Sequence, residues 1–117
     1  MKFAITTTAM LLAAASATAS ADQRIATFDL GSLDTLDALG LKEQVVGVPK
    51  ASLPDYLEQY AADDVTNIGG LRSPDMDALG ESEPSLILYT GRQGEWEEEL
   101  SEIAPLLNTS LQGDDYL

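Results

Sequence analysis

Three basic residues are the side chains of this sequence best placed to bind a ligand. Lys50, Arg72 and Arg92 each follow an expected strand, and ligands of open parallel sheets bind beyond the carboxyl ends of the strands. The chain has only 6 Lys and Arg residues against 20 Asp and Glu, so the gathering of three cations at one edge indicates an anion-facing rim. The alternative is that these loops simply carry polar side chains.

Arg92 is the sharpest single candidate on this rim. Gly91 permits a tight turn after the strand, and the guanidinium fork suits planar, delocalised oxygen groups. The alternative is a solvated loop arginine that pairs with Glu95. The turn at Gly31 and Ser32 leads into an expected helix N-terminus, whose free N–H groups can also meet an anion. This turn has a single glycine, so it is not a dinucleotide-binding fingerprint, and the sequence contains no P-loop.

Other kinds of site find little support. The chain contains no cysteine and no histidine, which excludes disulfides, Cys or His zinc sites, thiol nucleophiles and Ser-His-Asp arrangements. Asp34 and Asp37 share an expected helix face, as do Glu95 and Glu98 or Glu99, but both sets fit the solvated side of an amphipathic helix. We therefore expect a protein that is not an enzyme, with no catalytic residue and no metal site.

Composition bounds the class of protein further. A chain of 117 residues with 44% hydrophobic residues fits one small globular domain or a piece of a larger one. Its formal net charge of -14 repels phosphate backbones and anionic headgroups. Binding to nucleic acid or to a membrane surface is therefore not expected.

The first 21 residues have the pattern of a secretory signal peptide. Lys2 is followed by an apolar stretch from Phe3 to Ala15, and the run 19–21, Ala-Ser-Ala, is a typical cleavage site. No cysteine follows, so a bacterial lipoprotein anchor has no acceptor. We expect residues 1–21 to be removed and residues 22–117 to form a soluble α/β domain in the periplasm.

The mature sequence alternates strand and helix patterns. Strands are expected at 24–29, 45–48, 65–68, 85–89 and, more weakly, 106–109. Helices are expected after an N-cap at Ser32, over 53–60, after the Ser73-Pro74-Asp75 opening with Ser73 as its N-cap, and over 95–104, with 90–94 as a loop. Tyr56, Tyr60 and Trp96 fall on apolar helix faces. Such alternation predicts an α/β fold with an open parallel sheet of about five strands flanked by helices.

An ordered set of short motifs resembles the N-terminal lobe of periplasmic ferric-siderophore-binding proteins of ABC importers, in particular the catecholate-type branch. The motifs extend over nearly all of residues 24–117. They are Thr27–Gly40, Gly47–Lys50, Leu53–Leu57, Asn67–Leu71, Ser73–Asp75, Pro84–Leu88, the Gly91-Arg92-Gln93 run and Ile103–Pro105.

This resemblance implies a ligand and partners. Proteins of that family have two α/β lobes bridged by a long helix, and the arginine of the Gly-Arg-Gln motif faces the cleft, so Arg92 would contact an anionic ferric catecholate. Ferric iron would enter only as part of the siderophore, without a resident cofactor, and Glu81 and Glu83 are candidates for docking on the ABC permease at the inner membrane. The predicted ligand-binding residues are Arg92, Lys50, Arg72, Gly31, Ser32 and Gln93.

Two departures from the family pattern qualify the resemblance. The initial β-hairpin is absent, and the sequence stops at Leu117, where the family continues into the bridging helix and a C-terminal lobe. The expectation is one lobe of a two-lobed binding protein, whether a fragment, a truncated gene or an incomplete sequence. The alternative is an exported protein–protein interaction module or a non-functional fragment with no small-molecule ligand. The motifs do not distinguish a siderophore from heme or a corrinoid.

Overall fold

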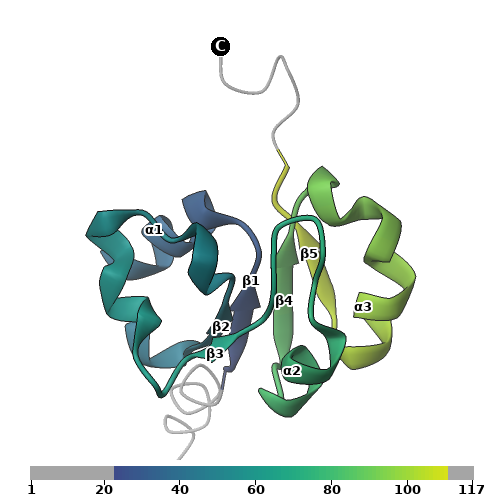
Figure 1. Cartoon of the computed structure of the whole chain (residues 1–117), viewed down its shortest axis with the longest axis horizontal. Coiled ribbons are helices and arrows are strands. Elements are labelled where there is room, and N and C mark those ends of the chain that lie inside the picture. The colour runs from purple at the N-terminus through teal and green to yellow at the C-terminus, as the bar shows by residue number, and fades with distance from the viewer. Residues whose placement is uncertain (1–22, 111–117) are drawn as a thin grey trace, which may run out of the picture.

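The computed structural model describes residues 23–110, so the expected signal peptide lies outside the described residues. Five parallel strands form one sheet in the order β3-β2-β1-β4-β5 (Figure 1). This confirms the predicted open parallel sheet. The strands are β1 Ile25–Thr27, β2 Val45–Val48, β3 Thr66–Asn67, β4 Leu86–Tyr89 and β5 Leu106–Asn108.

Helices cover the two faces of the sheet. In Figure 1, α1 lies on one side of the strands, and α2 and α3 lie on the other. The α-helices are α1 Leu30–Ala38, α2 Met76–Glu81 and α3 Glu97–Ile103, and the 3-10 helices are η2 Lys42–Gln44, η3 Lys50–Ser52, η4 Asp55–Ala61 and η5 Gly91–Trp96. No helix among residues 23–110 is long and apolar enough to cross a membrane.

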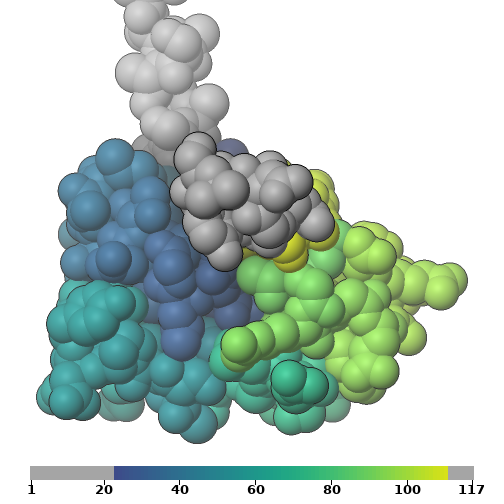
Figure 2. All heavy atoms as spheres, turned by 90° about the horizontal axis from the view of Figure 1, so that it is seen from above, coloured from purple at the N-terminus to yellow at the C-terminus, as the bar shows by residue number. Residues whose placement is uncertain are grey.

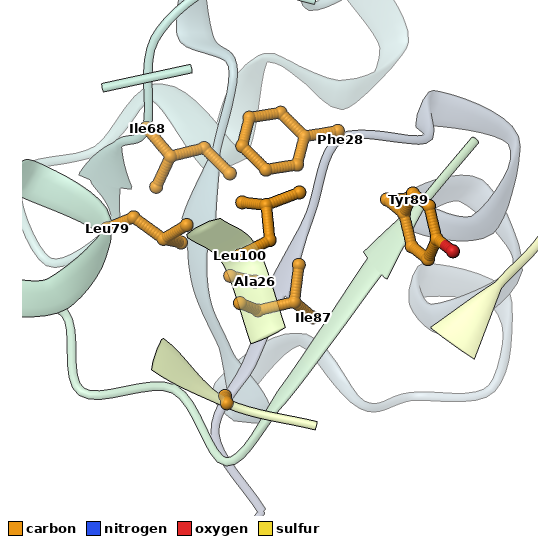
Figure 3. Packing of buried hydrophobic residues seen from close by; sticks show 8 residues of the cluster. Ala26, Phe28, Ile68, Leu79, Ile87, Tyr89 and Leu100 are labelled. Atoms are coloured by element: carbon orange, nitrogen blue, oxygen red, sulfur yellow. The ribbon is translucent and has the colours of Figure 1, made fainter. Parts of the chain in front are cut away.

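Each helical layer has its own hydrophobic cluster. Figure 3 shows the cluster beneath α2 and α3, where Phe28, Ile68 and Leu79 point toward Leu100. The second cluster joins α1 and η4 to β2 through Leu33, Val45, Val48, Leu57, Tyr60 and Val65. Alternate residues of a strand point to opposite faces, so the sheet is buried from both sides, as parallel sheets usually are.

Both predicted N-caps were wrong. Asp29, not Ser32, caps α1, because its carboxylate accepts a hydrogen bond from the Gly31 N–H. Asp75, not Ser73, caps α2 and accepts from the Ala78 N–H at 3.0 Å. Ser and Asp are about equally good caps, so the local sequence does not decide which of two neighbours begins the helix.

Two further expectations need correction. Residues 91–94 are not a loop but part of the 3-10 helix η5, because the Thr90 and Gln93 side chains form a capping box there, and the helix expected from residue 95 begins as α3 at Glu97. Tyr56 is 64% exposed rather than part of the core. A 3-10 helix has about three residues per turn, so η4 buries Leu57 and Tyr60 and turns Tyr56 outward.

Candidate functional site

A groove with a volume of about 990 Å³ opens at the carboxyl edge of β1, β4 and β5. Figure 2 looks onto this side of the molecule, where the blue first segment and the green-to-yellow segments from β4 onward come together. The lining combines leucines, hydroxyl side chains, one carboxylate and one guanidinium: Phe28, Asp29, Leu30, Gly31, Ser32, Thr35, Leu36, Leu71, Leu88, Thr90, Gly91, Arg92, Leu107, Thr109 and Ser110.

The apolar wall of the groove follows from strand alternation. Ile87 and Tyr89 of β4 belong to the cluster under α2 and α3, so Leu88 between them faces the opposite side. Leu107 is the partner of Leu88 in β5 and is 51% exposed. Their side chains and Leu36 of α1 give the groove an apolar surface suited to a ring or an alkyl chain.

Asp29 organises the polar end of the groove. Its carboxylate accepts hydrogen bonds from the Ser32 hydroxyl at 2.7 Å, the Thr109 hydroxyl at 2.8 Å and the Gly31 N–H at 3.2 Å. Because three donors are already committed to it, Asp29 connects the end of β1 to the start of α1 and to the end of β5. Its role in the groove is to order the polypeptide around it.

Arg92 lies at the start of η5, directly after β4. Its backbone N–H donates to the Thr90 hydroxyl at 3.3 Å, and the neighbouring Gly91 N–H donates to the Ser110 hydroxyl at 2.8 Å. The side chain is exposed, and among residues 23–110 no carboxylate, including Glu95, forms an ion pair with its guanidinium. The backbone is thus fixed at both residues, and the exposed Arg92 side chain lines the groove.

Gln93 lies beneath the same loop and is 0% exposed. Its side-chain oxygen accepts from the Thr90 N–H at 2.9 Å, and its amide group donates to the Leu71 carbonyl oxygen. Both ends of this side chain are therefore bonded to the protein.

The structure brings together only some of the predicted ligand-binding residues. Arg92, Gly31 and Ser32 line the groove. Lys50 and Arg72 do not line it: the Lys50 ammonium donates to the Ala62 carbonyl oxygen at 2.9 Å, and Arg72 is exposed next to Leu71. The ligand contacts expected of all six residues stay predictions.

Several groove residues were missed by the sequence reasoning. Asp29, Thr90, Thr109 and Ser110 all follow strands, so their position already placed them at the binding edge, although they were not counted among the predicted ligand-binding residues. Leu71 also follows a strand, but β2 and β1 separate that strand, β3, from β4, so its place at this groove could not be inferred from the strand end alone. Within the part of the chain that the structure describes, no group of three acidic side chains could hold a metal ion.

Comparison with known proteins identifies the family. A family model described as "Periplasmic binding protein" matches residues 25–115. The chain belongs to this family. The match bears out the family resemblance and the lobe-like α/β fold expected from the motifs.

Three relatives illustrate the similarity. The petrobactin-binding protein YclQ of Bacillus subtilis is 41% identical over 95 residues, which cover 81% of this chain and 30% of YclQ, and its crystal structure superposes with a TM-score of 0.73. The iron uptake ABC transporter substrate-binding protein PiuA of Streptococcus pneumoniae has a TM-score of 0.75 at 37% identity, covering 80% of this chain and 33% of PiuA. The catecholate-siderophore-binding protein VctP of Vibrio cholerae has a TM-score of 0.65 at 31% identity, covering 79% and 33%. The chain thus spans about a third of the length of these relatives.

Proposed function

We propose that this chain is a ligand-binding lobe of the solute-binding component of an iron–siderophore ABC uptake system. Its ligand is an anionic ferric complex, of catecholate type, held at the groove described above. The observation that carries the proposal is the exposed Arg92 guanidinium on an otherwise largely apolar groove. The siderophore-binding activities named for YclQ and VctP support the choice of ligand.

The groove suits such a complex chemically. A guanidinium presents a planar fork of N–H donors to anionic oxygens such as those of a ferric catecholate. Leu88 and Leu107 offer apolar contact to the aromatic rings of the ligand. Gly31 and Ser32 of the first turn of α1 line the same groove, with the Gly31 N–H and the Ser32 hydroxyl bonded to Asp29. Binding and release need no covalent step, so the proposed protein is not an enzyme and its iron is cargo.

The cations outside the groove have a different proposed role. Lys50 and Arg72 follow β2 and β3 and do not line the groove. In a chain with a formal net charge of -14, two positive charges near the same edge partly offset the repulsion of an incoming anion. We expect their removal to slow association more than it changes dissociation.

The proposed role also includes export to the periplasm and contact with an ABC permease. The protein acts in the periplasm after export, a second lobe completes the cleft, and Glu81 and Glu83 contact the permease at the inner membrane. Both glutamates are exposed at the end of α2, where Arg24 holds the backbone by donating to the Ser82 and Glu83 carbonyl oxygens. The acidic surface makes nucleic acid an unsuitable partner.

A fluorescence titration tests the proposed function. The chain has one tryptophan, Trp96 in η5, so ferric petrobactin added to the purified full chain should quench its emission in a saturable way. Iron-free petrobactin is the control for binding that does not require the ferric complex. Linear, non-saturable quenching by both would overturn the proposal, and a stable homodimer in size-exclusion chromatography that ignores ferric petrobactin would favour the interaction module.

A further inference from the structure

Gln93 joins two segments of the groove that come from distant strands. It follows β4, and its amide donates to the carbonyl oxygen of Leu71, which follows β3. In the sheet, β3 and β4 are separated by β2 and β1. The segment after β3 therefore reaches across the carboxyl edge to bring Leu71 to the groove, and Gln93 is bonded to its far end.

The segment that Gln93 holds, residues 69–74, is a tight hairpin. Gly69 has a φ of 99° and forms an antiparallel bridge with Pro74. The Gly70 and Ser73 backbones exchange hydrogen bonds of 3.0 and 3.3 Å. These contacts fix the shape of the 69–74 hairpin, but they are internal to it. The Gln93 amide instead links the hairpin to the β4 side of the groove.

The oxygen of the same side chain acts on Arg92. It accepts from the Thr90 N–H at 2.9 Å and the Thr90 hydroxyl at 3.3 Å, and that hydroxyl accepts from the Arg92 N–H at 3.3 Å. One buried amide thus connects the backbone that carries the guanidinium to the hairpin that carries an apolar wall residue.

We propose that Gln93 is a positioning residue, which sets the placement of Leu71 relative to Arg92 and so preorganises the groove without touching the ligand. The predicted effect of Gln93 on affinity rests on the proposed function, whereas its predicted effect on the 69–74 hairpin does not. Replacing a buried polar side chain whose oxygen and nitrogen are both hydrogen-bonded costs stability. Because Gln93 already holds two elements of the groove in place, the ligand has to order less of the protein when it binds, and less free energy is lost on binding.

The first arm of the test needs no ligand. Gln93→Met keeps the length of the side chain and removes both hydrogen-bonding groups, and Gln59→Met makes the same change at an exposed glutamine of η4, outside the groove. Amide hydrogen exchange should accelerate about tenfold or more at Gly70 and Ser73 in Gln93→Met, and stay unchanged there in Gln59→Met. The Phe28 amide, which donates to the Leu88 carbonyl oxygen, reports on the sheet. Unchanged exchange in the hairpin would overturn the proposal.

The second arm measures affinity for ferric petrobactin. Gln93→Met should weaken binding about tenfold, and the same substitution in an Arg92→Ala background should weaken it by less than about threefold, because residues that act as one unit are not additive. A simple contribution to stability would give equal losses in both backgrounds, and that result would overturn the proposal, as would unchanged affinity.

Two further outcomes are also decisive. If Gln93→Met does not fold, Gln93→Asn takes its place. The asparagine side chain is one methylene shorter, so its amide cannot reach both Thr90 and Leu71. If hydrogen exchange in the hairpin and the affinity for ferric petrobactin then match those of the unchanged protein, the proposal is overturned. If the unchanged protein shows no saturable quenching, the proposed function fails, and hydrogen exchange alone decides whether Gln93 places the hairpin.

Discussion

The Asp29 carboxylate accepts a hydrogen bond of 2.8 Å from the hydroxyl of Thr109, 80 residues away in the chain. Asp29 follows β1 and Thr109 follows β5, and β4 lies between these two strands in the sheet. The contact therefore spans the end of β4, where η5 begins with Gly91 and Arg92. It closes the polar end of the groove with the same carboxylate that caps α1.

Replacing Asp29 should destabilise the fold as well as the groove. Asp29→Ala removes the N-cap of α1 and the acceptor for Ser32 and Thr109, with an expected loss of about 2–3 kcal/mol in the free energy of unfolding. Asp34→Ala, an exposed acid of the same helix, should change it by less than about 0.5 kcal/mol. Urea denaturation followed by circular dichroism measures both; equal midpoints for the two variants would contradict the role given to Asp29.

Stability should fall at alkaline pH because of Tyr60. Burial, together with the hydrogen bond to Asp37 and its negative charge, raises the pKa of Tyr60 well above the ordinary value of 10.0. The neutral phenol is thus favoured in the folded state, so its contribution is fully present below about pH 10 and is lost as the pH rises above that value, where the unfolded tyrosine ionises.

Tyr60→Phe tests this pH dependence. It should lower stability at neutral pH through the lost hydrogen bond to Asp37, and should flatten the decline above about pH 10. The decline should not vanish, because the hydrogen bond to Glu97 and burial also raise the pKa of Tyr89. Urea midpoints measured from neutral to alkaline pH provide the comparison, and parallel curves for the variant and the unchanged protein would refute the assignment.

Gly69 should tolerate no side chain. Its φ of 99° is strained for other residues, and a Cβ atom there would lie 2.8 Å from the Ser73 carbonyl oxygen and against the Asp75 N–H. Gly69→Ala should cost about 2 kcal/mol or more in the free energy of unfolding. At Gly80 of α2 a Cβ meets nothing within 4 Å, so Gly80→Ala should stabilise by about 0.5–1 kcal/mol. Thermal unfolding of both variants checks the opposite signs.

The sequence predicted the framework of the fold well because the apolar runs are unambiguous. Residues 45–48 form β2 as expected, and the expected strand at 85–89 forms β4 at residues 86–89. Helix beginnings were harder, because Asp29 and Asp75 compete with nearby serines for the same capping role. Competing caps differ too little in energy for local reasoning to choose between them.

The site was partly predictable for a different reason. Arg92 follows β4, which lies at the centre of the groove. Its place after a strand in the alternation of strands and helices was therefore enough to predict that it lies at the site. Lys50 and Arg72 also follow strands, but β2 and β3 lie on the other half of the sheet. All five strands end at the same edge of the sheet, but the groove lies at the ends of β1, β4 and β5. Only the order of the strands tells which strand ends lie at the groove. Contacts such as Asp29–Thr109 depend on that order as well.

In the proposed complex, Arg92 binds an anionic ferric siderophore in the groove. The most direct measurement is the affinity of the full chain for ferric petrobactin, by quenching of Trp96, in Arg92→Ala and in Lys42→Ala, which removes one positive charge from η2 outside the groove. Arg92→Ala should weaken binding about tenfold to a hundredfold, as expected for the loss of a charge-assisted hydrogen bond, while Lys42→Ala should change it less than about twofold. Equal affinities for Arg92→Ala and the unchanged protein would contradict the account.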